Sequence, residues 1–301
     1  MRNKIIQIVL LTALSIYLFY GFDTTKIDFS KFSLFGISAT FMMILFSQLV
    51  LSVRWMKMSQ LSFKISFETI IVSSALNMIL PAKLGELSKA FYLKKFYQYN
   101  YHKTLSIIFV ERFFDIIMLF LLLCIWVYDY TASEIIKSSL LILGVGILMI
   151  IFLFNTSKTL QLLKKIPFQF LRVYLQKIYK VVHKMFQSPL SLSFYTAALW
   201  MTYFVGTYIL FTYGVRFDLD ITTILGLFIF STVALSLPLA PAGIGTYEAA
   251  VVFYLSGYGV SKEDALLAAT LYHLLLFSVD FLLFYLFLFF KDIKFQELVK
   301  R

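Results

Sequence analysis

Cysteine and histidine are scarce in this chain of 301 residues, which has Cys124 as its single cysteine and three histidines. A single cysteine excludes an intrachain disulfide and a cysteine-based metal cluster. Three histidines scattered along the sequence do not support a zinc site either. The sequence also lacks P-loop, GxGxxG, GxSxG and HExxH patterns, so ATP hydrolysis and the common hydrolase mechanisms have no support. We therefore expect neither a metal nor a cofactor.

Charged residues are few as well: they make up 14% of the chain, against 60% hydrophobic residues, and the mean hydropathy is +0.85. This composition is typical of a membrane protein and not of a soluble domain. Several apolar runs are long enough, or nearly so, to span ~30 Å of hydrocarbon at ~1.5 Å per residue. They lie at about 5–22, 34–53, 104–128, 138–155, 190–213 and 264–290. The sequence predicts an all-α polytopic protein with about six spanning helices in a single membrane domain, 1–301.

The distribution of basic residues predicts how the chain is oriented in the membrane. If the N-terminus is cytoplasmic and 67–103 enters the bilayer and returns, most of the 27 Lys and Arg, including Arg54 and Lys89, lie on the cytoplasmic side or its rims. The opposite side then has Lys26, Lys31, Lys137, Arg216 and Lys262. This asymmetry follows the positive-inside rule and predicts cytoplasmic N- and C-termini. Because topology accounts for the net charge of +11, we expect no nucleic-acid partner.

The long polar stretch 156–189 is rich in lysine, has no acidic residue, and alternates its charges with apolar residues. Two interpretations are open for it. It forms an interfacial helix, or a pair of helices, on the anionic cytoplasmic leaflet, or it is a solvated basic linker.

Two matching segments break the apolar pattern at corresponding places in the two halves of the chain. Each has a proline and glycine turn, a glutamate, a short helix, and then a long apolar helix with polar groups inside. The turns and glutamates are Pro81, Gly85 and Glu86 in the first segment and Pro241, Gly243, Gly245 and Glu248 in the second. The predicted orientation makes the segments re-enter from opposite sides, which is the inverted-repeat plan of many transporters. We predict repeats over about 34–128 and 190–290, with both turns lining a polar cavity.

Three charged residues, Glu111, Arg112 and Asp115, lie within the apolar run 104–128, about 10–16 Å from its start at ~1.5 Å per residue. Charges at this depth are costly unless they are paired or hydrated, which makes them candidates for function. In one interpretation Arg112 faces a cavity and binds a phosphate with its planar fork, while the carboxylates hold it. In the other, the charges only pair with one another and join helices.

Four more polar residues are candidates for the same cavity: Asn77, Lys83, His273 and Asp280. Lys83 either adds a positive charge or extends to the membrane interface. His273 and Asp280 are seven positions apart and thus share a helix face, although a single helix histidine is often a packing residue. Glu86 and Glu248 either face the cavity or cap the short helices that they begin.

These residues form one pattern: Asn77, Pro81, Gly85 and Glu86, then Glu111, Arg112 and Asp115, then Pro241, Gly243, Gly245 and Glu248, followed by Gly257-x-Gly259-Val260. The pattern resembles the lysylphosphatidylglycerol synthase transmembrane region, a flippase-like family that includes the membrane domain of multiple peptide resistance factor. The resemblance covers roughly 5–290. It implies a bacterial or archaeal membrane protein that moves lipids, or lipid-linked sugars, between leaflets. Two positions depart from the family, because His273 and Lys89 stand where it often has arginine.

The repeat and the resemblance together favour a flippase that shields the head group of an anionic lipid in a polar cavity, in the cytoplasmic membrane of a prokaryote. The alternative is a membrane-embedded transferase acting on an isoprenoid phosphate or a phospholipid, with Glu86 or Glu111 as its base. A third hypothesis is an accessory protein whose charges only pack helices. Two opposed broken segments suit alternating access, whereas an enzyme needs one site, so we expect transport and no enzymatic activity. The pair Asp218 and Asp220 is expected to be a solvated loop, and a homo-oligomer stays open.

Overall fold

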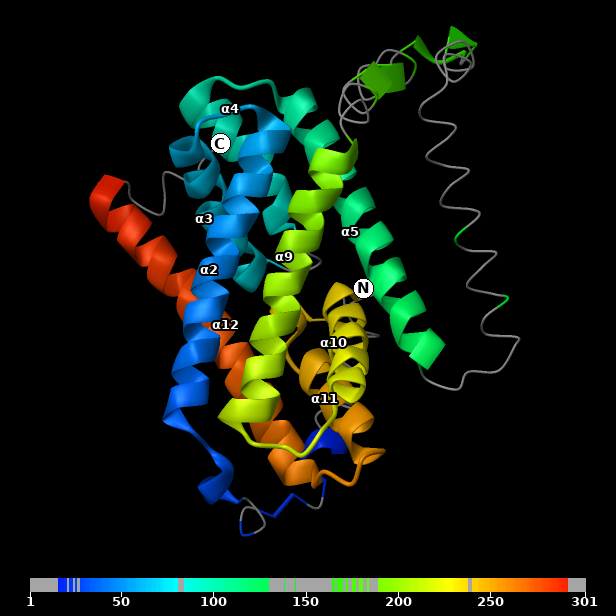
Figure 1. Cartoon of the computed structure of the whole chain (residues 1–301). Helices are drawn as coiled ribbons and strands as arrows, with labels where there is room; N and C mark the ends of the chain where they lie inside the picture. Colours follow the sequence, from blue (N-terminus) through cyan, green and yellow to red (C-terminus); the bar gives the residue numbers. More distant parts are fainter. Residues whose placement is uncertain are drawn as a thin grey trace. The chain divides into compact units, whose positions relative to one another are not determined.

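The structure is a computed structural model. It describes residues 16–20, 22, 23, 25, 28–80, 84–129, 138, 144, 164, 165, 167–169, 172, 175, 176, 179, 180, 183, 189–237 and 240–291. Over these residues the chain is helical and has no β-strand, which confirms the all-α prediction (Figure 1). Several predictions fall wholly or largely outside the described residues: the runs 5–22 and 138–155, the basic stretch 156–189, Pro81 and Lys83.

The described elements are helices and single helical turns. In chain order they are η2 (Phe29–Lys31), α2 (Leu34–Ser59), α3 (Phe63–Ile79), α4 (Gly85–Tyr97), α5 (Tyr101–Asp129), α9 (Pro189–Ile209), the π-helical turn η4 (Leu210–Gly214), α10 (Ile221–Ser236), η5 (Pro241–Gly243), α11 (Thr246–Ser256) and α12 (Lys262–Lys291).

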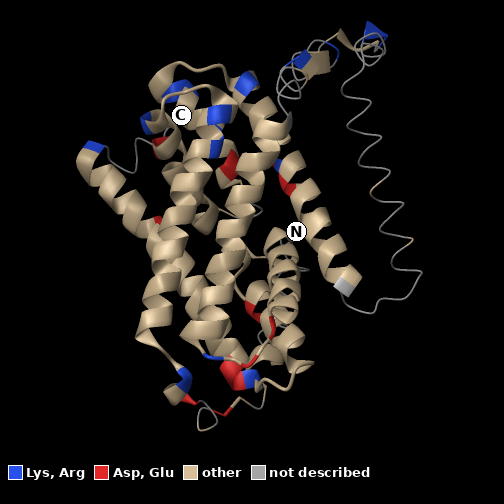
Figure 2. Ribbon diagram, in the orientation of Figure 1, with Lys and Arg blue, Asp and Glu red and all other residues tan. Residues whose placement is uncertain are grey.

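Within the described residues, three helices are long and apolar enough to cross a membrane. They are Leu34–Ser59, Leu190–Gly214 and Lys262–Lys291, which coincide with three of the predicted runs. The 26 residues of the first extend over about 39 Å at ~1.5 Å per residue, more than the ~30 Å of a hydrocarbon core. Figure 2 shows how sparse the charged residues are along these helices. The full number of spans stays a prediction.

The chain divides into two compact units, each built from segments far apart in the sequence. The first unit takes its described residues from Met1–Leu49, Ile70–Ser88 and Met201–Arg301, and the second takes them from Val50–Thr69 and Lys89–Trp200. Each unit thus draws on both halves of the chain. The predicted repeats 34–128 and 190–290 stay a prediction.

The first unit has an apolar core in which α11 packs against both α10 and α12. Leu210, Val251, Leu255 and Ala265 are among its fully buried side chains. Ala268 and Ala269 lie on the same face of α12 as Ala265 and are also fully buried. These small side chains allow α11 and α12 to approach closely.

In the second unit, aromatic and polar side chains tie α3, α4 and the end of α2 together. Tyr92 donates a hydrogen bond to the buried carboxylate of Glu68 at 3.0 Å, and Tyr97 donates to the same oxygen. The hydroxyl of Tyr99 donates to the carbonyl of Ser59 at 2.6 Å. These bonds hold the C-terminal half of α4 and the turn that follows it against α3 and the end of α2.

Both helix breaks lie where the sequence predicts them, and the first depends on a close approach. α3 ends at Ile79 and α4 begins at Gly85. A Cβ atom on Gly85 would lie 2.3 Å from the backbone nitrogen of Asn77, so only glycine fits between the two helices. The carbonyl of Gly85 also accepts hydrogen bonds from Ser73 at 3.1 Å and Ser88 at 2.5 Å.

The second break has an unusual backbone between α10 and α11. Ala242, Gly243 and Gly245 have φ values of +53°, +78° and +82°. These values lie in the left-handed region, which is energetically unfavourable for a residue that has a Cβ atom. Ala242 therefore needs support from its surroundings. Whether either broken segment re-enters the bilayer stays a prediction.

The loop aspartates have a structural explanation. Asp220 is the N-cap of α10 and accepts a hydrogen bond from the backbone N–H of Thr223 at 2.6 Å. This bond holds the pKa of Asp220 below its usual value. Asp218 is exposed, as expected for a solvated loop.

We predict that Gly85→Ala destabilises the protein and impairs its activity. The added methyl group meets backbone atoms, which cannot rotate away, so α3 and α4 must separate at a cost of about 1–3 kcal/mol. Gly206→Ala is the matched control, because the nearest atoms would lie at 3.8 and 3.9 Å, in ordinary contact. The apparent Tm in detergent should fall for the first variant only. Equal Tm values for the two variants would contradict the close approach.

Candidate functional site

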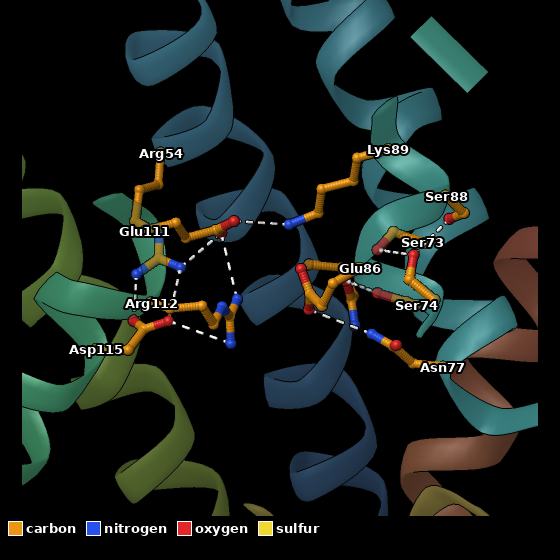
Figure 3. Close-up of polar contacts among 12 residues, drawn as sticks. Arg54, Ser73, Ser74, Asn77, Glu86, Ser88, Lys89, Glu111, Arg112 and Asp115 are labelled. Carbon is orange, nitrogen blue, oxygen red and sulfur yellow. Dashed lines mark hydrogen bonds and ion pairs between the residues drawn. The ribbon is translucent and has the colours of Figure 1, made fainter. Parts of the chain in front are cut away.

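A buried ionic network in the second unit is centred on Glu111 of α5. Its two carboxylate oxygens accept hydrogen bonds from Arg54 of α2 and Lys89 of α4, each at 2.7 Å (Figure 3). The ammonium group of Lys89 also lies 4.6 Å from the ring centre of Trp55, a favourable cation–π contact. One carboxylate therefore joins three helices.

Asp115 extends the network by one helical turn. Arg54 donates to Asp115 at 2.5 Å, and the indole N–H of Trp200 donates to the same oxygen at 3.0 Å. Since Glu111 and Asp115 are four positions apart, they share a face of α5, and the guanidinium of Arg54 spans both. Arg112 also contacts both carboxylates, at 3.6 Å to Glu111 and 3.4 Å to Asp115.

The members of this network differ greatly in exposure. The side chains of Arg54, Lys89 and Glu111 are 1%, 2% and 0% exposed, whereas those of Asp115 and Arg112 are 15% and 39% exposed. The buried members neutralise one another, as buried charges must. Arg112 is the most exposed cation of this network.

The sequence predicted Glu111, Arg112 and Asp115 and missed the partners that hold them. Our topology assigned Arg54 and Lys89 to the cytoplasmic side or its rims, where cations need no partner. Arg54 directly follows the apolar run 34–53, where a cation can meet either lipid head groups or a buried carboxylate, and the sequence does not distinguish the two. Lys89 lies in the more polar α4, where hydropathy gives no reason to expect a buried charge.

In the first unit, two predicted residues of the first broken segment contact each other. The side-chain amide of Asn77 donates to Glu86 at 3.2 Å (Figure 3). Glu86 lies in the first turn of α4, where the helix dipole favours a negative charge. The capping and cavity interpretations of Glu86 are compatible with this contact.

Asp280, near the middle of α12, has a partner that the sequence did not suggest. Gln48 of α2 donates its side-chain amide to Asp280 at 2.8 Å, and Ser74 of α3 donates to the other end of that amide at 3.5 Å. The carboxyl group of Asp280 is buried, and the neutral amide of Gln48 satisfies part of its hydrogen-bonding capacity. Gln48 escaped notice because an uncharged amide hardly changes the hydropathy of a long apolar helix.

Glu248 and His273, both predicted, are in direct contact in the first unit. His273 Nδ1 lies 2.7 Å from Glu248 Oε1, and His273 Nε2 lies 3.1 Å from the carbonyl oxygen of Ala242. The second carboxylate oxygen of Glu248 accepts from the backbone N–H of Gly245 at 2.7 Å. Glu248 therefore both caps α11 and pairs with α12. A cavity shared by this pair and the network around Glu111 stays a prediction.

Comparison with known proteins identifies the family. Residues 4–283 match the sequence profile described as lysylphosphatidylglycerol synthase TM region. The chain belongs to this family. A UPF0104 membrane protein of Methanocaldococcus jannaschii is 26% identical over 208 residues, which cover 66% of this chain and 87% of that protein. No solved structure matches the sequence at a significant level.

Membership in the lysylphosphatidylglycerol synthase TM family confirms the resemblance drawn from the motif residues. Together with the three long apolar helices, it makes the chain a helical membrane protein. The family also indicates a role related to membrane lipids.

We predict that Glu111→Gln destabilises the protein strongly. Arg54 and Lys89 then face a neutral amide while they stay buried, and breaking a buried pair costs about 3–5 kcal/mol. The apparent Tm in detergent, followed by circular dichroism, should fall accordingly. Lys57→Met, an exposed change on the same helix as Arg54, is the control and should alter stability by less than about 0.5 kcal/mol.

A double variant tests whether the network acts as a unit. Adding Lys89→Met to Glu111→Gln should recover part of the lost stability, because it removes a cation that faces the altered position. Strictly additive losses in the two single variants and the double variant would contradict the coupling.

Proposed function

We propose that the protein moves membrane lipids with anionic head groups between leaflets, and that Arg112 binds the lipid phosphate. The observation that carries this proposal is the difference between Arg112 and Arg54 within the network around Glu111. Arg112 is the most exposed member and has the longest contacts, at 3.4 and 3.6 Å, whereas Arg54 contacts the same carboxylates at 2.5 and 2.7 Å.

This arrangement allows Arg112 to leave its carboxylates at little cost. Glu111 keeps Arg54 and Lys89 when Arg112 turns to a ligand, and Asp115 keeps Arg54 and Trp200. The buried negative charges thus stay compensated in both states. A guanidinium offers two parallel N–H donors to phosphate oxygens, which suits a phosphodiester head group.

The surroundings support a lipid more than a soluble anion. The family indicates a lipid-related role. Because the protein has helices long enough to cross a membrane, the acyl chains of a bound lipid can stay in the bilayer while its head group contacts the protein. Two helix breaks at corresponding places, after Ile79 and after Ser236, fit an alternating-access transporter built from inverted repeats. We place it in the cytoplasmic membrane of a prokaryote with both termini inside.

The transferase alternative finds less support at Glu111. A general base needs access to the proton that it removes, and Glu111 is fully buried between two cations. Glu86 accepts a hydrogen bond from Asn77 and is partly exposed, so it is the remaining candidate base.

Transport can be measured with the purified full chain in vesicles that contain a fluorescent anionic phospholipid, read by quenching of the outer leaflet. We expect Arg112→Lys to slow transport by about tenfold or more, because one charge-assisted hydrogen bond contributes about 1.5–3 kcal/mol. Arg216→Lys makes the same change in an exposed loop and should have no effect. Conversion of the lipid to a new product would instead identify a transferase.

A neutral variant separates phosphate binding from helix pairing. If Arg112 only pairs with Glu111 and Asp115, then Arg112→Gln changes stability while the folded protein transports lipid at close to the wild-type rate, and our proposal is wrong. If Arg112 binds phosphate, Arg112→Gln loses transport while the protein still folds, because Glu111 keeps Arg54 and Lys89.

The orientation is testable by single-cysteine labelling in a Cys124→Ser background. Cysteine at position 94 should react from the cytoplasmic side, and cysteine at position 218 from the outer side, because basic residues gather inside. Reaction of position 94 from outside would show that α3 crosses the membrane and would overturn the re-entrant arrangement.

A further inference from the structure

The two contacts of His273 require one proton more than a neutral histidine and an ionised glutamate carry together. Its Nε2 atom faces the carbonyl oxygen of Ala242 at 3.1 Å. A carbonyl oxygen only accepts hydrogen bonds, so Nε2 must carry hydrogen. The Nδ1 atom faces Glu248 Oε1 at 2.7 Å, which is a hydrogen-bond distance and needs one further proton between the two atoms.

The alternatives without this proton fail on both tautomers. A neutral histidine with hydrogen on Nε2 would point the lone pair of Nδ1 at an ionised carboxylate oxygen. The other tautomer would point the lone pair of Nε2 at the Ala242 carbonyl. With the extra proton, the pair is either imidazolium with carboxylate or imidazole with carboxylic acid, and both states have zero net charge. Zero charge suits a site where His273 and Glu248 are both buried.

We infer that Glu248 and His273 together form a proton-binding site, and that the bound proton holds the second broken segment against α12. Glu248 belongs to α11 and Ala242 to the turn η5, so His273 contacts both parts of this segment. Loss of the proton leaves Nε2–H on the Ala242 carbonyl and makes the contact of Nδ1 with the Glu248 carboxylate repulsive. The segment is therefore held at low pH and released as the pH rises through the value at which the pair loses its proton.

The groups around the pair are aromatic or uncharged. The ring of Tyr247 on α11 lies 5.2 Å from the His273 ring, and Tyr272 on α12 stacks on Tyr247 at 6.0 Å. The hydroxyl of Tyr272 bonds to Thr207 of α9, and Phe277 covers the other side of His273 at 4.6 Å. Among the described residues, no other charged side chain contacts Glu248 or His273.

The turn η5 tends to open when the segment separates from His273. Ala242 has a φ of +53°, a conformation that costs a residue with a Cβ atom free energy unless its surroundings hold it. The hydrogen bond from His273 to the Ala242 carbonyl supplies that support, and it is lost once repulsion between Nδ1 and Glu248 separates α12 from the segment. The proton site itself does not depend on lipid transport, whereas a coupling of proton uptake to transport rests on the proposed function.

The experiment compares wild-type protein with Glu248→Gln by hydrogen–deuterium exchange of 240–256 in nanodiscs. A glutamine at this position donates to Nδ1 and still accepts from the Gly245 N–H, so it satisfies every contact without a titratable proton. Between about pH 5 and pH 9, the exchange of wild type relative to the variant should rise with pH. The rise reaches up to about tenfold per pH unit once the unprotonated pair dominates. Equal exchange at every pH would overturn the proposal.

Asp280→Asn is the matched control, because it removes another buried carboxyl group from α12 and leaves the pair intact. It should keep the wild-type pH profile. A profile abolished by Asp280→Asn and kept by Glu248→Gln would assign the titration to Asp280 and refute our inference.

A second measurement does not depend on exchange. With ¹⁵N-labelled histidine and with His102 and His183 replaced by glutamine, NMR reports the protonation of each ring nitrogen of His273. We expect hydrogen on Nε2 throughout and a pH-dependent proton at Nδ1. An Nδ1–H tautomer with bare Nε2 at every pH would overturn the proposal, even if lipid transport is later demonstrated. Absence of transport with the expected NMR and exchange results would leave the proton site standing and reject only the proposed function.

Discussion

Charge buried in apolar surroundings must be compensated locally, and most of what positions the helices of this protein depends on that constraint. Glu111 has no exposed surface, and its compensation comes from Arg54 and Lys89, 57 and 22 positions away in the sequence. The pair of Glu248 and His273 likewise joins positions 25 apart. Apolar packing favours contact between helices in general, whereas each of these polar contacts requires one particular pair of residues to meet. The few charges therefore contribute to which helices meet and in which register.

Hydropathy and chain-breaking residues predicted a large part of the fold. The runs 34–53, 190–213 and 264–290 became long helices, and both breaks appeared beside their glycines, because these features are local. The partners of the buried charges were not local. A helix pattern gives the face and the depth of Glu111 but not the neighbour it meets. Arg54 near the end of an apolar run looks the same whether it meets lipid head groups or a buried carboxylate.

The two units compensate their buried charge by different chemistry. The network around Glu111 uses arginine and lysine, and arginine keeps its charge at every accessible pH. Arg112 can exchange its partners, as we propose, but neither Arg112 nor Arg54 can lose its charge. The Glu248 pair uses histidine instead, at a position where the family resemblance leads one to expect arginine. An arginine there would neutralise Glu248 permanently. Histidine makes the same compensation conditional on one proton.

The short helices explain why such conditional contacts have leverage. At ~1.5 Å per residue, the 11 residues of α11 extend over about 16 Å, roughly half of a hydrocarbon core. This helix is too short to cross the core by itself, whereas α2 and α12 are long enough to do so. It is held by its packing against α10 and α12 and by the contacts of His273 with Glu248 and with the Ala242 carbonyl of the preceding turn. Removing one proton makes the contact of His273 with Glu248 repulsive, so a change of one charge acts directly on the contacts that hold α11 and the turn before it.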